Sequence, residues 1–168
     1  SCFEEVGVPK CTAEELEYAA ALKATYPPER DVPGIGAKFD AGIAKQVKAL
    51  SENMTKPVYD FLMPQYSGEG FRPGSTDVGD VSWQTPTAQI EVAVWPAGVP
   101  RHSWQVVACG KSSMAHKAML CAGKVIASAA IELLEQPALL EKAKSEFKER
   151  SASGYVCPIE PDAVPIAL

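Results

Sequence analysis

The stretch Ala88-Gln-Ile-Glu-Val-Ala-Val-Trp95 decides the expected fold, because apolar side chains recur at every second position along it. Ile90, Val92 and Val94 fall on one face of an extended chain, which is typical of a half-buried strand. Residues 104–108, Trp-Gln-Val-Val-Ala, predict a second short strand. We therefore expect the chain to contribute strands to a β-sheet.

Helical patterns surround these strands. The predicted helices cover residues 14–25, 41–53, 114–136 and 138–150. The longest of them has an apolar row with steps of three and four residues, made of Met119, Ala122, Ile126, Ala129 and Leu133. Helices alternating with strands predict an α/β fold. Because two strands rarely make a stable sheet, we expect the sheet to be incomplete here and to be completed by chain outside this sequence.

Composition and charge exclude several classes of protein. The chain has 168 residues, enough for one domain with a core, and a net charge of −5. Its Lys and Arg residues are scattered, so binding to nucleic acid is not expected. No apolar run approaches the roughly 20 residues that cross a bilayer. The five cysteines, an odd number without a C-x-x-C pair, favour a reducing compartment, and we expect the cytoplasm.

His116 is the first candidate for chemistry. It follows Ser112-Ser-Met-Ala at the start of the longest predicted helix. The positive end of a helix dipole disfavours imidazolium, and neutral imidazole is the form that binds a metal ion. The alternative is a histidine with a structural hydrogen bond. A complete metal site needs three or four ligands, which the two histidines and scattered carboxylates do not clearly supply.

The segment Gly74-Ser-Thr-Asp-Val-Gly-Asp80 is the most unusual part of the sequence. Thr76 or Asp77 can cap the first turn of a short helix, which makes Asp77 and Asp80 neighbours at i and i+3. Such paired carboxylates can bind a metal ion or relay a proton. The alternative is helix capping by exposed acids.

His102 is the second histidine, in a predicted turn before the second strand. Its imidazole can bind a substrate carboxylate or an oxyanion. The alternative is a surface histidine beside Arg101.

Several stretches of the chain resemble the zinc-dependent carboxypeptidase and aminoacylase amidohydrolases, in their aminobenzoyl-glutamate hydrolase branch. The ten-residue loop is the most specific of them. The stretches are Gly74-Ser-Thr-Asp-Val-Gly-Asp-Val-Ser-Trp83, Pro100-Arg-His-Ser-Trp-Gln-Val-Val-Ala108, Ala115-His-Lys117 and Tyr155-Val-Cys-Pro-Ile159.

The resemblance implies a two-domain enzyme. Its three-layer α/β/α catalytic domain binds two zinc or manganese ions, and an inserted lid domain forms a homodimer. A metal-bridging water attacks an amide of an N-acyl amino acid, aminobenzoyl-glutamate or a dipeptide-like substrate, and a Glu acts as general base. His116 matches the last metal-ligand histidine of the family. Asp77 matches an Asp of the loop near the site, and His102 falls close to that site, so both are expected at the substrate.

The chain also departs from the family. The H-x-D motif, the Glu-Glu pair that contains the general base, and another ligand histidine are absent from this sequence. We therefore expect a C-terminal part of the catalytic domain in residues 1–150, with an extended tail in residues 151–168. Alone it is expected to be inactive, with the N-terminal half of the catalytic domain as its partner. The alternative is a non-catalytic domain or a regulatory subunit that has lost the metal site.

Overall fold

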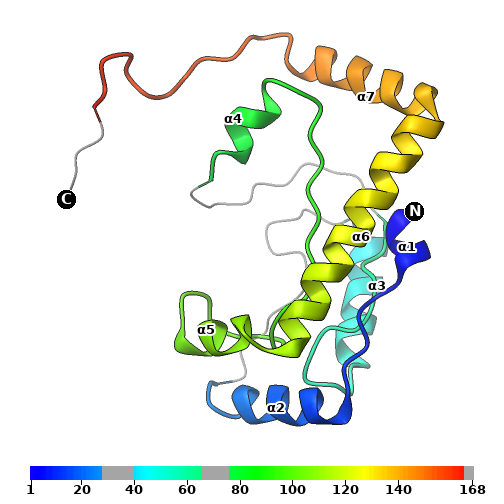
Figure 1. The fold of residues 1–168 in the computed structure, drawn as a ribbon, viewed down its shortest axis with the longest axis vertical. Coiled ribbons are helices and arrows are strands. Elements are labelled where there is room, and N and C mark those ends of the chain that lie inside the picture. The colour runs from blue at the N-terminus through cyan, green and yellow to red at the C-terminus, as the bar shows by residue number, and fades with distance from the viewer. Residues whose placement is uncertain (28–39, 66–75, 165–168) are drawn as a thin grey trace. The chain divides into compact units, whose positions relative to one another are not determined.

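The computed structural model describes residues 1–27, 40–65 and 76–164. Within these ranges the chain forms helices and no strand (Figure 1). The helices are α1 (Cys2–Val6), α2 (Ala13–Lys23), α3 (Ala41–Glu52), α4 (Val78–Ser82), α5 (Trp104–Gly110), α6 (Ser113–Glu135) and α7 (Pro137–Arg150). The four helices predicted from the sequence correspond to α2, α3, α6 and α7.

The predicted α/β fold with an incomplete three-layer sheet is wrong, because the described residues form a small helical domain. Residues 88–95 have no regular structure, although side chains along residues 90–94 still alternate between half-buried and exposed. The alternation thus predicted which side chains are covered. It could not supply a second extended segment, and a strand forms only where another segment pairs with its N–H and C=O groups.

The second predicted strand, residues 104–108, lies in helix α5 instead. The Ser103 side chain accepts a hydrogen bond from the backbone N–H of Val106 at 3.5 Å and caps the helix. Gln105 and Cys109, four residues apart, are buried together. An N-cap and a helical spacing of the buried positions therefore outweigh the strand propensity of this short apolar run.

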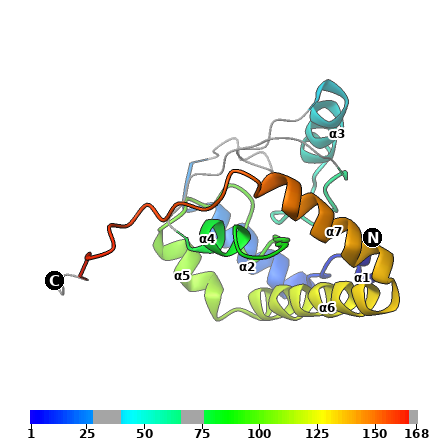
Figure 2. The ribbon, with the colours of Figure 1, turned by 90° about the horizontal axis from the view of Figure 1, so that it is seen from above.

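The chain divides into two compact units. The first unit comprises Ser1–Pro73 and Ile90–Ala130, and the second comprises Gly74–Gln89 and Ile131–Leu168. Helix α6 starts in the first unit and ends in the second as one continuous helix (Figure 2). The division predicted from the sequence, into residues 1–150 and 151–168, stays a prediction.

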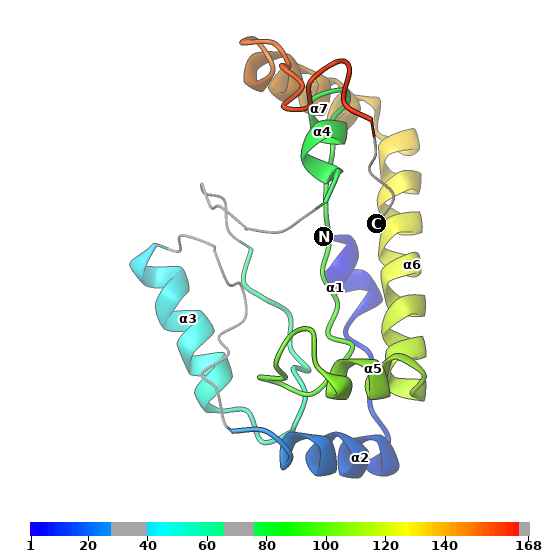
Figure 3. The ribbon, with the colours of Figure 1, turned by 90° about the vertical axis from the view of Figure 1, so that its left-hand side faces the viewer.

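The core of the first unit lies where α2 and α5 meet the N-terminal end of α6 (Figure 3). Its buried side chains are Ala19, Leu22, Val58, Cys109 and Met114, with Cys11, Leu16, Trp95 and Ala108 packed against them. Side chains from distant parts of the sequence are thereby removed from water at one place, which fixes the start of α6.

Helix α6 buries a different face from the predicted one. Met114, Ala118, Cys121 and Val125 are buried, with steps of four, three and four residues, whereas Met119 is 63% exposed. The sequence of α6 carries more than one apolar row, so periodicity alone could not select the row that faces the core. In the part of the chain that the structure describes, neither α6 nor any other helix is long and apolar enough to cross a membrane.

Candidate functional site

The acidic loop forms the short helix α4, as the sequence allowed. Asp77 is its N-cap residue, but the Asp77 side chain makes no capping hydrogen bond and is exposed. The Thr76 hydroxyl accepts a hydrogen bond from the Val78 N–H at 3.3 Å instead. The Asp77 carbonyl accepts one from the Val81 N–H at 3.0 Å, which ties Asp77 into the first turn. Its carboxylate is thus left accessible to a ligand.

Tyr155, in the segment that follows α7, contacts α4 in two ways. Its hydroxyl donates a hydrogen bond to a carboxylate oxygen of Asp80 at 2.7 Å. Its ring lies 6.3 Å from the Trp83 ring, measured between centroids. The hydrogen bond with Asp80, followed by one with Cys157, raises the pKa of Tyr155, so the hydroxyl stays a donor over the physiological range. Sequence reasoning found Tyr155 only as part of a resembling stretch.

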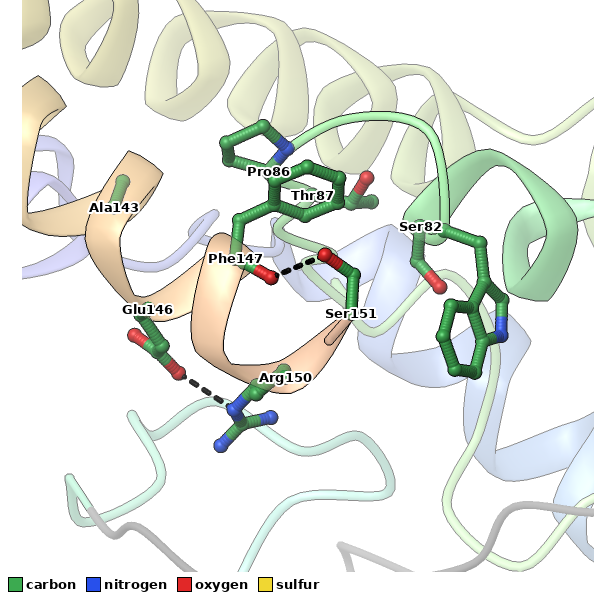
Figure 4. Close-up of a pocket in the computed structure, with 9 residues that line it drawn as sticks. Ser82, Pro86, Thr87, Ala143, Glu146, Phe147, Arg150 and Ser151 are labelled. Carbon is green, nitrogen blue, oxygen red and sulfur yellow. Dashed lines mark hydrogen bonds and ion pairs between the residues drawn. The ribbon is translucent and has the colours of Figure 1, made fainter. Parts of the chain in front are cut away.

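A shallow groove lies between this loop and α7 in the second unit (Figure 4). Its volume is about 370 Å³, and it is lined by Ser82, Trp83, Pro86, Thr87, Ala143, Glu146, Phe147, Arg150 and Ser151. The Arg150 guanidinium pairs with Glu146 at 3.0 Å, and the Ser151 hydroxyl donates to the carbonyl of Phe147 at 2.7 Å. The two charges compensate each other, so the groove has no strong preference for an ion of either sign.

His116 lies in the first turn of α6, as predicted. Its backbone N–H donates to the Ser112 carbonyl at 3.1 Å, and the Ser112 hydroxyl accepts from the Ala115 N–H at 3.2 Å. The side chain is exposed. The helix start thus holds the His116 backbone firmly while its imidazole remains open to a ligand.

The described residues do not supply a complete metal site. Among residues 1–27, 40–65 and 76–164, no three His, Cys, Asp or Glu side chains gather closely enough to hold a metal ion. His102 and His116 belong to the first unit and Asp77 belongs to the second. A metal site that uses His116 therefore needs ligands from outside this set.

His102 occupies an exposed turn before α5, with φ of 58°. This left-handed region is costly for most residues and worst for β-branched ones, whereas Asn adopts it readily. We expect His102→Val to lower the free energy of unfolding by about 1 kcal/mol and His102→Asn to change it by less than about 0.5 kcal/mol. Urea unfolding of both variants measures the difference. Equal losses in the two would show that the backbone conformation at this position is not the cause.

Glu15 is the centre of a buried polar network that sequence reasoning did not find. Its carboxylate accepts hydrogen bonds from the Lys117 ammonium at 2.8 Å, the Ser113 hydroxyl at 2.6 Å and the Thr12 N–H at 2.7 Å. These donors, Lys117 first, lower the pKa of Glu15 to about 2. The Thr12–Glu15 capping box was predicted, but no local pattern relates Glu15 to a lysine 102 residues later. The network joins α2 to α6 just beside His116.

The similarity of this chain to known sequences is with hydrolases of the aminobenzoyl-glutamate type, which confirms the predicted resemblance. The relative is one of the subunits of p-aminobenzoyl-glutamate hydrolase from Escherichia coli (strain K12), and the two are 32% identical over 166 residues. That alignment covers 96% of this chain, and the chain spans 34% of the length of the relative. The shares fit the prediction that the chain corresponds to one part of such a hydrolase. No family model matches the chain, and no solved structure matches it.

Proposed function

We propose that this chain is part of an amidohydrolase that cleaves aminobenzoyl-glutamate, an N-acyl amino acid or a dipeptide-like amide. The observation that supports the proposal is the 32% identity to a hydrolase subunit over 96% of the chain. In this proposal the general base lies outside the present sequence, and the chain alone is inactive. The five cysteines without a disulfide agree with a cytoplasmic location.

Three residues carry the proposed roles. The exposed His116, fixed at a helix start, is one ligand of a site for two divalent metal ions, zinc or manganese. Bound there, such ions activate a water for attack on the amide carbonyl. Asp77 and His102 contact the substrate. His116 supplies at most one of the ligands, since the described residues hold no group of three.

The proposed partners are the rest of the hydrolase and a second copy of it, joined through a lid domain. The chain spans only 34% of its relative, and α6 exposes the apolar side chains of Met119 and Ile126. A neighbouring part of a longer protein that covered these side chains would remove them from water.

The test uses the natural gene product at full length. Hydrolysis of p-aminobenzoyl-glutamate and bound metal are both measured, in the unaltered protein and in His116→Ala. We expect His116→Ala to lower both kcat/KM and the metal content, while Lys124→Ala, an exposed position on the same helix, changes neither. Full activity with unchanged metal in His116→Ala would overturn the assignment of His116.

A non-catalytic domain or regulatory subunit is the second candidate, favoured by the missing ligand group among the described residues. It predicts a natural product close to 17.9 kDa that binds no metal and hydrolyses none of these amides. Intact mass and the same assay therefore separate the two candidates.

A further inference from the structure

Helix α4 cannot hold its position by itself. It has five residues, none of them buried. Isolated helices shorter than about 12 residues are marginal in water, so α4 depends on contacts with other parts of the chain. The Gly74–Trp83 loop that contains it is also the segment that the sequence singles out as functional.

The contacts that tie α4 to a distant segment meet at one residue, Tyr155. Its hydroxyl bonds to Asp80 and its ring packs near Trp83, so it contacts the helix itself and the residue directly after it. Gly154, with φ of 81°, lies in the left-handed region that favours glycine, in the turn after α7 that leads to Tyr155. Both partners and the turn belong to the second unit.

We propose that Tyr155 is a positioning residue that fastens the segment after α7 to α4 and so sets the place of Asp77. The link to Asp77 is direct, since its carbonyl accepts from the Val81 N–H, in the same short helix as Asp80. The functional consequence rests on the proposed function, because it concerns a carboxylate assigned to the substrate. The fastening itself does not.

Hydrogen exchange at α4 in the natural full-length protein measures the fastening without any assay of activity. The reporters are the backbone N–H groups of Val81, Trp83 and Gln84, which bond within α4 and its C-terminal turn. Tyr155→Phe keeps the ring and loses one hydrogen bond. We expect it to speed exchange of these groups roughly threefold to tenfold. Tyr155→Ala, which also loses the ring contact, is expected to speed it further.

Tyr18→Phe is the matched control. Tyr18 is 39% exposed against 38% for Tyr155, and its hydroxyl donates to the Ala108 carbonyl at 3.0 Å in the first unit. It is expected to leave exchange in α4 unchanged. Asp80→Asn should act like Tyr155→Phe, and the double variant should be less affected than the sum of the two, since the two residues share one interaction.

Unchanged exchange in Tyr155→Phe, or equal acceleration in Tyr18→Phe, would overturn the proposal. In a protein that hydrolyses the amide, Tyr155→Phe is further expected to raise KM more than it lowers kcat, through the displaced Asp77. If no amide is cleaved, the proposed function fails while the exchange result still decides the role of Tyr155.

Discussion

Met114→Ala is expected to lower the free energy of unfolding by about 2–4 kcal/mol. Met114 is only 4% exposed and packs in the core cluster with residues of α2 and α5, including Leu22 and Cys109. Truncation loses the transfer free energy of the side chain and leaves a cavity where three helices meet, which the rigid helix backbones cannot close.

Met119→Ala is the control for this prediction. It makes the same chemical change on the same helix, but its side chain is 63% exposed. We expect a change within about 0.5 kcal/mol. Urea unfolding of both variants, in the same protein and buffer, gives the comparison. A loss at Met119 as large as at Met114 would mean that the row with Met119 and Ile126 is the buried one, as the sequence alone had predicted.

The contrast between these two methionines shows where sequence reasoning succeeds. The existence and ends of α2 and α3 follow from local chemistry, because Thr12 and Asp40 cap them by bonding to N–H groups three residues later. Such interactions are short in sequence and can be read directly. Which face of α6 is buried depends instead on residues of other helices, and the sequence of α6 does not contain that information.

The same limit explains the errors in the sheet and the residues that were missed. The alternation along residues 90–94 is real in the structure, but a strand also needs a second extended segment, which local alternation does not encode. The Tyr155–Asp80 and Lys117–Glu15 contacts span 75 and 102 residues. The candidate residues themselves could be selected by local context, as His116 and Asp77 were, but not the contacts that hold their surroundings.

Glu15→Gln is expected to destabilise the protein at pH 7 by about 1–3 kcal/mol. The substitution keeps the size of the side chain but removes the charge that accepts from Lys117, Ser113 and Thr12. The Glu15 side chain is only 8% exposed, which makes its bonds costly to break, whereas that of Lys117 is 37% exposed. The released ammonium can therefore be hydrated, and the loss should stay below the roughly 3–5 kcal/mol of a fully buried pair.

The pH dependence gives this prediction its sign and its control. The folded-state pKa of Glu15 is lowered to about 2 from an ordinary 4.5, so the unfolded chain takes up the proton first as the pH falls. The stabilisation is present in full above about pH 5 and is lost between about pH 4.5 and pH 2. The difference between the unaltered protein and Glu15→Gln should shrink over that window, whereas Glu14→Gln, at the exposed neighbouring position, should show little loss at any pH. A difference that stayed constant from pH 7 to pH 3 would mean that the lost contribution comes from the shape of the side chain and not from its charge.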